Sequence, residues 1–331
     1  MKIGLFGLGR LGSFHAKTLR ELDTVSDLFL WDPRTDRCEA MASELDARPA
    51  QTREELFDQC DALVIASSTA SHAELLGQAL ERNMPTYCEK PVAVSLEETR
   101  TLAEKAEASG TFVQVGFQRR FDRGFAAAAD KVKSGAIGDL MMLRSTSHDK
   151  EPPHADYIPL SGGIYADLMI HDCDLIRFVS GQEFVQVYVL GSNLGHTGFA
   201  EHGDVSQTLC SFELSGGTIG TMSGTRTDPR GYDNRLEIYA TRDSLVAGWD
   251  ARTPLKSLDA DLGADPSECY QGFLDRYAPA YRYEIQRFTE AVTRGEESIC
   301  TVSDAYEAQR VAVASELSRR ENRPVPLDQV R

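Results

Sequence analysis

The chain has 331 residues, of which 41% are hydrophobic and 26% charged, as expected for a globular protein with room for two domains. Its formal net charge of −16 argues against nucleic-acid binding, because phosphate backbones favour clusters of Lys and Arg. We find no apolar run long enough to span a membrane and no signal-peptide pattern, which together favour a cytoplasmic protein. Seven cysteines without CxxC pairs indicate reduced thiols and no zinc site.

The first part of the chain alternates short apolar runs with amphipathic segments. We predict strands over 2–6, 26–31, 62–66, 85–88 and 111–115, with helices over 13–22, 36–45, 53–60, 71–82 and 95–109 between them. Such alternation requires a parallel sheet covered by helices on both faces. The expected fold class is α/β, with a Rossmann dinucleotide-binding domain over residues 1–120.

A GxGxxG pattern follows the first predicted strand, and an acidic residue closes the second strand 20 residues later. Glycines allow the sharp turn, the close approach of a pyrophosphate and tight packing of the helix, whose N-terminus attracts phosphate. An ordinary glycine-rich turn is the alternative, which the flanking strands and the acid disfavour. The predicted cofactor contacts in this unit are Gly7, Gly9, Arg10, Leu11, Gly12 and Asp32.

The acid also indicates which dinucleotide binds. The Asp32 carboxylate can accept hydrogen bonds from ribose hydroxyls and would repel a 2′-phosphate, which favours NAD. Arg34 and Arg37 lie close enough in sequence to soften this preference, so NADP remains possible.

Two polar groups follow later predicted strands, at the sheet edge where ligands bind. Ser67, Ser68 and His72 could line the cofactor cleft or begin a helix. Glu89 could hydrogen-bond a ribose, and Lys90 could stabilise alkoxide character as hydride leaves a substrate. A surface ion pair is the alternative for Glu89 and Lys90.

After Gly116 the pattern changes to helices over 121–134 and 164–179 and to consecutive strands over 140–147, 184–192, 205–214, 218–226, 235–240 and 244–248. Consecutive strands suggest an antiparallel sheet. Residues 253–266 are predicted to form a loop, and helices over 277–294 and 303–321 end the chain. We therefore assign residues 121–331 to a substrate-binding and oligomerisation domain whose last helix could pack back on the first domain.

The segment 162–178 combines polar and apolar residues in a helical pattern. On an α-helix, Asp167, His171 and Asp174 would share one narrow face, while most other positions are apolar. Asp167 could fix the tautomer of His171, leaving the other ring nitrogen to take a proton from a substrate hydroxyl. A buried structural Asp–His pair is one alternative. A metal site is another, although the sequence offers no third ligand with suitable spacing.

Further candidates have weaker signals. Gln118 and Arg120 stand at the presumed crossover between domains, where they could reach nicotinamide or substrate or simply be linker residues. His148 and Tyr283 are candidates for the substrate pocket. His15, one turn into the first helix, could touch the cofactor, although we expect it to be solvated.

Together these residues resemble the glucose–fructose oxidoreductase / inositol dehydrogenase (Gfo/Idh/MocA) family. The resemblance rests on GLGRLG at 7–12, Glu89-Lys90-Pro91, GFQRRFD at 116–122 and GGIYADLMIHDCDLIRF at 162–178, and it runs through nearly the whole chain. It implies a Rossmann domain followed by an α+β domain with an open, mostly antiparallel sheet, which in the family commonly forms a dimer interface within dimers or tetramers.

By the same resemblance, Lys90, Asp167 and His171 match the catalytic trio, and Asp174 matches a position that contacts polyol hydroxyls. We expect an NAD-dependent, inositol 2-dehydrogenase-like enzyme acting on a secondary hydroxyl of a cyclic polyol or sugar. The alternatives are an aldose or anhydrosugar dehydrogenase, a relative reducing another carbonyl or imine, and a non-catalytic NAD-sensing regulator. The run His148-Asp149-Lys150-Glu151-Pro152 departs from the inositol dehydrogenase pattern, which leaves the substrate open.

Overall fold

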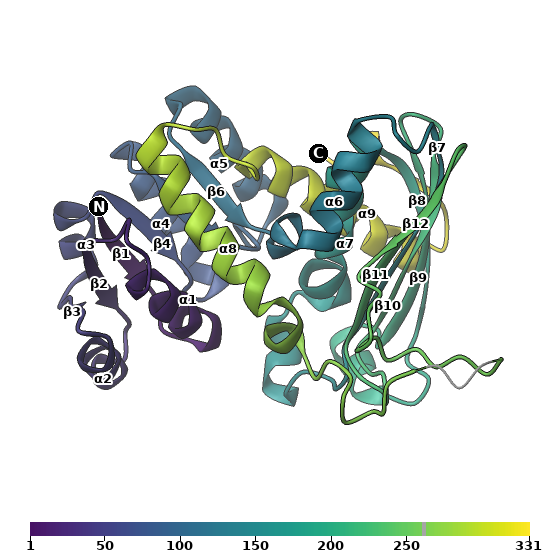
Figure 1. The fold of residues 1–331 in the computed structure, drawn as a ribbon, viewed down its shortest axis with the longest axis horizontal. Helices are drawn as coiled ribbons and strands as arrows, with labels where there is room; N and C mark the ends of the chain where they lie inside the picture. Colours follow the sequence, from purple (N-terminus) through teal and green to yellow (C-terminus); the bar gives the residue numbers. More distant parts are fainter. Residues whose placement is uncertain (260–262) are drawn as a thin grey trace. The chain divides into compact units, whose positions relative to one another are not determined.

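The computed structural model describes residues 1–259 and 263–331, which form two compact units (Figure 1). The first unit contains residues 1–118 and 279–306, and the second contains residues 119–278 and 307–331. From the sequence we expect a single boundary after residue 120. Residues 279–306 instead group with the first unit, because Ile285 and Phe288 of α8 (Phe273–Arg294) are buried in its core. In the predicted loop over 253–266, residues 260–262 lie outside the described residues.

Among the described residues, the first unit has one six-stranded parallel sheet in the order β3-β2-β1-β4-β5-β6. Its strands are β1 (Lys2–Phe6), β2 (Asp27–Trp31), β3 (Arg48–Pro49), β4 (Ala62–Ile65), β5 (Thr86–Glu89) and β6 (Val113–Gly116). The predicted Rossmann fold is therefore confirmed. Strand β3 was not predicted, since two residues carry no periodicity.

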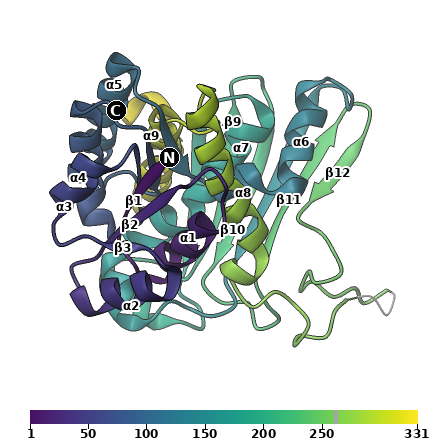
Figure 2. The same ribbon diagram turned by 60° about the vertical axis from the view of Figure 1, so that its left-hand side comes forward.

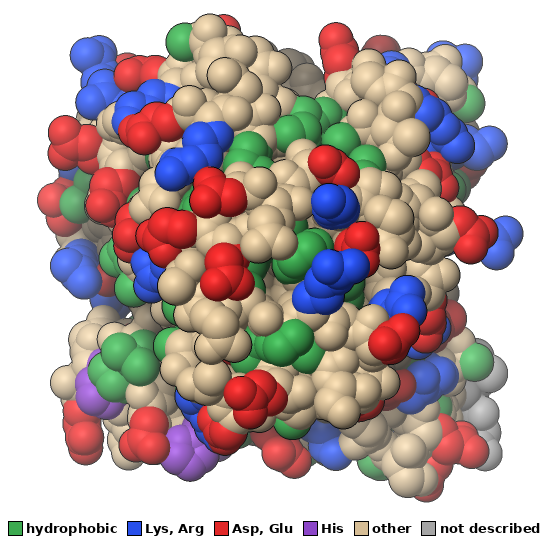
Figure 3. All heavy atoms as spheres, turned by 90° about the vertical axis from the view of Figure 1, so that its left-hand side faces the viewer, with side chains coloured by type: hydrophobic (Ala, Val, Ile, Leu, Met, Phe, Trp, Pro, Cys, Tyr) green, Lys and Arg blue, Asp and Glu red, His purple; other side chains and the backbone are tan. Residues whose placement is uncertain are grey.

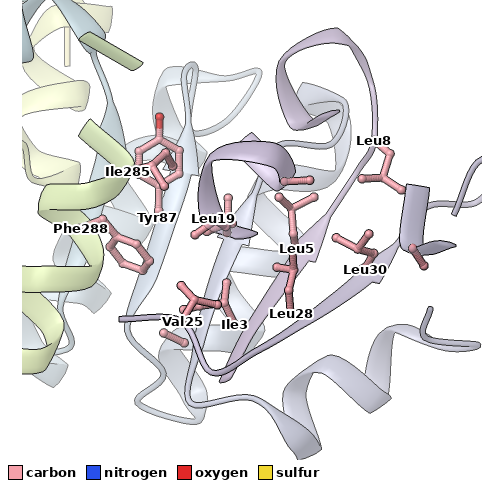
Figure 4. Close-up of a cluster of buried hydrophobic side chains, with 14 of the residues drawn as sticks. Ile3, Leu5, Leu8, Leu19, Val25, Leu28, Leu30, Tyr87, Ile285 and Phe288 are labelled. Atoms are coloured by element: carbon pink, nitrogen blue, oxygen red, sulfur yellow. The ribbon is translucent and has the colours of Figure 1, made fainter. Parts of the chain in front are cut away.

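Successive side chains of β1 point to opposite faces of this sheet. Ile3 and Leu5 lie in a buried cluster with Leu19 and Phe288 (Figure 4). Phe6 packs on the opposite side against Phe57, with ring centroids 5.4 Å apart. The flanking helices are α1 (Arg10–Arg20), α2 (Thr35–Leu45), α3 (Arg53–Gln59), α4 (Thr69–Glu81) and α5 (Leu96–Ser109) (Figure 2). Helices on both faces bury every central strand, as the apolar runs require.

The second unit is built on a mixed sheet in the order β12-β11-β7-β10-β9-β8-β13. Its strands are β7 (Leu140–His148), β8 (Phe184–Ser192), β9 (Gln207–Leu214), β10 (Ile219–Thr225), β11 (Asp233–Ala240), β12 (Ser244–Ala247) and β13 (Val325–Pro326). Strands β7 and β10 are parallel and the other neighbours are antiparallel, which confirms the predicted mostly antiparallel sheet.

The mixed sheet is covered on one face. Helices α6 (Arg123–Lys133) and α7 (Ile170–Ser180) lie against that face, and in the described residues no helix covers the other (Figure 1). Further described elements are helix α9 (Val302–Glu321) and the short helices η1 (Gln118–Phe121), η2 (Ala155–Leu160), η4 (Thr197–His202) and η5 (Leu327–Gln329).

The predicted single α-helix over 164–179 is wrong in its first part. Residues Tyr165–Met169 form a π-helix, η3, and the α-helix α7 begins only at Ile170. Gly162 and Gly163 approach it with φ of +78° and +88°, and the Ile164 N–H donates to Asp204 at 3.0 Å. The two glycines and the Asp204 contact fix how the chain enters the helix. Because the first turn is a π-helix, Asp167 and His171 are not separated by one α-helical turn.

Candidate active site

The glycine turn after β1 has the geometry that the sequence predicts. Gly7 has φ of +91°, and a Cβ there would collide with the backbone of Ser67. A Cβ on Gly12 would collide with the carbonyl oxygen of Gly7. A Cβ on Gly9, the N-cap residue of α1, would meet nothing within 4 Å. The turn is thus closed toward the sheet and open over Gly9, as a pyrophosphate cradle requires.

Asp32, directly after β2, is fixed by the backbone around it. Its Oδ2 accepts from the Leu8 N–H at 2.7 Å, and its Oδ1 accepts from the Arg34 N–H at 2.9 Å. Nη1 of Arg37 lies 3.9 Å from Oδ2, while Arg34 pairs with Asp36. The carboxylate therefore stands beside the glycine turn with one Arg near it.

The loops after β4 and β5 are joined through His72. Its ring nitrogens lie 2.8 Å from the Pro91 carbonyl oxygen and 3.1 Å from the Ser67 carbonyl oxygen. Burial lowers the pKa of the His72 imidazole, although the two carbonyl contacts oppose the shift. Ser68 is the N-cap residue of α4, and the Lys90–Pro91 peptide is cis. The predicted positions Ser67, Ser68, His72 and Lys90 are thus held on two neighbouring strand ends.

Glu89 takes part in a buried network within the first unit. Its Oε1 lies 2.7 Å from Nε2 of His15 and accepts from the Tyr87 hydroxyl at 2.9 Å. That hydroxyl also lies 3.0 Å from Oε2 of Glu284 on α8. Burial and the two carboxylates raise the pKa of Tyr87, so the phenol stays protonated. The expectation that His15 is solvated is wrong, since the side chain is fully buried.

In the second unit, the donors to Asp167 include Arg226 and Tyr157. Nη1 of Arg226 donates to Oδ2 at 2.8 Å, and the Tyr157 hydroxyl donates to Oδ1 at 3.2 Å. The same Arg226 nitrogen lies 3.6 Å from Oδ2 of Asp149. Burial would lower the pKa of Arg226, but Asp167 and Asp149 raise it above its usual value. Sequence reasoning missed Arg226, Asp149 and Tyr157.

Two further ion pairs anchor α7. Arg119 pairs with Asp172 at 3.1 Å. Arg120 forks onto Asp174, with Nη2 donating to Oδ1 at 2.6 Å and Nε donating to Oδ2 at 2.9 Å. All four side chains are almost fully buried. The helix that carries His171 is therefore fixed in place by paired charges.

The remaining predicted residues lie in different surroundings. His148 is partly exposed at the end of β7, with Nδ1 3.4 Å from Asp228 and Nε2 3.4 Å from the Ser223 hydroxyl. His171 and Gln118 are buried, and Oε1 of Gln118 has no hydrogen-bond partner among the described residues. Tyr283 is half exposed on α8.

Other properties of the described residues bear on function. Over the face shown in Figure 3, acidic and basic side chains are interspersed. Among residues 1–259 and 263–331, no group of three His, Cys, Asp or Glu side chains is placed to hold a metal ion. Within the same ranges, no helix is both long and apolar enough to cross a membrane.

The free energy of unfolding is expected to depend on pH through Asp149. Burial raises the pKa of Asp149 to about 6 from an ordinary 3.8, although Arg226 opposes the shift. Between these values the folded chain binds more protons than the unfolded chain, so this contribution falls as pH rises from 4 to 6. Asp149→Asn should remove that fall, on the order of 2 kcal/mol, in urea titrations across this range. Asp156→Asn, at an exposed carboxyl, is the control, and identical pH dependence in all three proteins would contradict the assignment.

Comparisons with known proteins identify relatives of this chain and of its fold. Residues 1–117 match an oxidoreductase family with an NAD-binding Rossmann fold, and residues 125–246 match the GFO/IDH/MocA C-terminal domain. The myo-inositol 2-dehydrogenase of Thermotoga maritima is 32% identical over 333 residues, covering 100% of this chain and 99% of that protein. The scyllo-inositol 2-dehydrogenase (NAD(+)) of Bacillus subtilis is 33% identical over 332 residues, covering 99% and 96%. A crystal structure of a myo-inositol dehydrogenase from Corynebacterium glutamicum superposes with a TM-score of 0.91 at 32% identity, covering 99% of this chain and 98% of that one.

Proposed function

Because the chain belongs to the GFO/IDH/MocA family of NAD-binding oxidoreductases, we propose that it oxidises a secondary hydroxyl of a cyclic polyol, inositol-like in shape, to a ketone. The observation that carries the proposal is the full-length similarity to two inositol dehydrogenases together with the presence of Lys90, Asp167 and His171. A related sugar is the second substrate class within this proposal.

The cofactor site is assigned to the first unit. The cradle open over Gly9 would receive the pyrophosphate, and Asp32 would accept from the adenosine ribose. Bound NAD supplies the acceptor for the hydride that leaves the substrate carbon. The other proposed cofactor contacts are Gly7, Arg10, Leu11, Gly12, Ser67, Ser68, His72, Glu89 and Gln118.

The proton chemistry is assigned to three side chains. His171 takes the hydroxyl proton as general base, and the anionic Asp167 orients the imidazole and stabilises its charge. Lys90, directly after β5, donates to the substrate oxygen and stabilises its negative charge as hydride departs. The proposed roles need an ionised Asp167, which its pairing with Arg226 supports.

Further polyol contacts are proposed for His148, Tyr283, Asp174 and Arg120. Each oxygen of Asp174 has lone pairs beyond those that Arg120 uses, so Asp174 can accept from a substrate hydroxyl while Arg120 fixes its position.

Absorbance at 340 nm over a panel of inositols, aldoses and anhydrosugars tests this function. We expect NAD⁺ reduction with at least one inositol isomer and weaker turnover with aldoses. Faster turnover of an aldose than of any inositol would favour a sugar dehydrogenase instead. Binding of NAD⁺ with no turnover on any member of the panel would contradict the proposal and favour a sensing role.

Cofactor preference gives a separate prediction. NADH should bind more tightly than NADPH, because Asp32 occupies the place where a 2′-phosphate would sit. Asp32→Ser should weaken NADH binding and strengthen NADPH binding, each by about tenfold, since Arg37 would then lack its carboxylate neighbour. Fluorescence titration of both reduced cofactors measures this. Tighter binding of NADPH by the unmodified chain would overturn the assignment.

A homo-oligomer, a dimer or tetramer, is proposed through the uncovered face of the mixed sheet. Leu190, Leu209, Ile219 and Val246 are large apolar side chains exposed on its strands. Exposed apolar side chains gathered on one sheet face are typical of an interface. Sedimentation of the purified protein as a monomer would contradict this proposal.

A further inference from the structure

Arg226 is a buried cation at the centre of an acidic cluster in the second unit. Its side chain is 2% exposed and lies directly after β10. Nη1 contacts Asp167 at 2.8 Å and Asp149 at 3.6 Å. Nε and Nη2 are buried and have no hydrogen-bond partner among the described residues. Of these two carboxylate contacts, the one with Asp167 is the shorter.

The backbone brings this cluster together. Strands β7 and β10 run in parallel, and the Asp149 N–H donates to the Thr225 carbonyl oxygen at 2.9 Å, which places Asp149 beside Arg226. The π-helix η3 supplies Asp167, and η2 supplies Tyr157. Asp149 and Asp167 thus lie beside the Arg226 guanidinium, and Tyr157 donates to Asp167.

We propose that Arg226 is a positioning residue that keeps Asp167 ionised and fixed for its work on His171. This inference rests on the proposed roles of Asp167 and His171. Because its shorter carboxylate contact is with Asp167, we assign Arg226 a role through that carboxylate and no catalytic role of its own.

Charge balance gives the physical reason. Without the guanidinium, Asp149 and Asp167 would be neighbouring, partly buried carboxylates of like charge, and one of them would hold a proton at higher pH. A protonated Asp167 cannot stabilise an imidazolium on His171. The charged or titratable groups around Arg226 are Asp149 after β7, Tyr157 of η2, Asp167 of η3 and Asp204 before β9, with Arg119 of η1 also acting on Asp149.

The consequence is a specific pH signature. The unmodified enzyme should keep its kcat down to the pH at which His171 itself gains a proton. In Arg226→Gln, protonation of Asp167 should move the acid limb of the kcat profile upward by at least about one pH unit, with partial recovery of kcat in alkaline buffer. Arg226→Lys retains the charge and should keep the acid limb close to its original position.

A matched control separates this role from a structural one. Arg235 pairs with Asp233 at 2.8 Å, the same distance as Arg226 to Asp167, and both side chains of that pair are buried. Arg235→Gln removes an equivalent ion pair in the same unit without touching Asp167. It should lower stability while leaving the pH profile unchanged.

The test measures kcat, KM and NAD⁺ affinity against pH for the full-length variants loaded with NAD⁺. We expect a shifted acid limb and at least a tenfold lower kcat near pH 7 for Arg226→Gln, with unchanged NAD⁺ affinity. If that variant fails to fold, Arg226→Gln combined with Asp149→Asn removes both charges, and its acid limb should still lie above that of Asp149→Asn alone.

The outcomes distinguish the two proposals. A folded Arg226→Gln protein with the original profile, or with equal loss at every pH, would overturn the role of Arg226. If the unmodified chain oxidises no polyol, the proposed function itself fails, whatever the variant does.

Discussion

Replacing His171 by alanine is expected to lower kcat by about 10²–10⁴-fold, the usual contribution of a positioned general base. The imidazole lies on α7, whose position is fixed by the Arg119–Asp172 and Arg120–Asp174 pairs, so its removal should leave the helix in place. NAD⁺ affinity should hardly change, because the proposed cofactor contacts lie in the other unit. Stopped-flow turnover and fluorescence titration measure the two quantities.

A matched variant tests whether replacing a histidine outside the proposed site also lowers activity. His202 is exposed, so His202→Ala should retain full activity. His171→Ala with unaltered kcat would rule out its role as base. Equal losses in both variants would also count against the assignment.

Replacing Lys90 by methionine is expected to lower kcat by about 10²–10³-fold, as loss of one donor to a developing oxyanion does. The side chain follows β5 directly, and its neighbour Glu89 is fixed by His15 and Tyr87, so the backbone position of residue 90 does not depend on the ammonium. Lys90→Arg retains the charge but not the compact geometry and should recover only part of the rate.

Exposed Lys105 on α5 supplies the comparison, since Lys105→Met removes a charge at a residue that we assign to no site. It should leave kcat unaltered. A Lys90→Met protein that changes KM alone would show that Lys90 binds substrate without stabilising the oxyanion.

The parts of the fold that depend on local sequence could be predicted. The glycine turn and Asp32 lie within one strand–helix–strand unit, so their spacing predicts that they serve one cofactor, and in the structure the Leu8 N–H of that turn donates to Asp32. Ser95 with Glu98 forms a capping box at the start of α5, and Gly110 ends the helix with φ of +66°. These signals act over a few residues.

The parts that depend on distant residues could not be predicted. His15 is buried because Glu89, 74 residues later, supplies its partner. Arg226 meets Asp149 only through the parallel pairing of β7 and β10. The turn that leads into the π-helix Tyr165–Met169 is held by Asp204, which accepts from the Ile164 N–H. In each case the deciding partner lies outside the window in which periodicity carries information.

The assignment of α8 follows the same logic. Its amphipathic pattern predicts a helix, yet the pattern does not determine which hydrophobic core the apolar face packs into. Thr289 of α8 accepts from the Thr24 hydroxyl at 2.8 Å, and Phe288 joins the core with Leu19, so this segment belongs to the first unit.

A crystal structure of the full-length protein with NADH and an inositol that it oxidises would test the central claim most directly. We predict that Nζ of Lys90 and one ring nitrogen of His171 both lie within about 3.2 Å of the same substrate hydroxyl. A substrate bound with either group out of reach of the reacting oxygen would contradict the account.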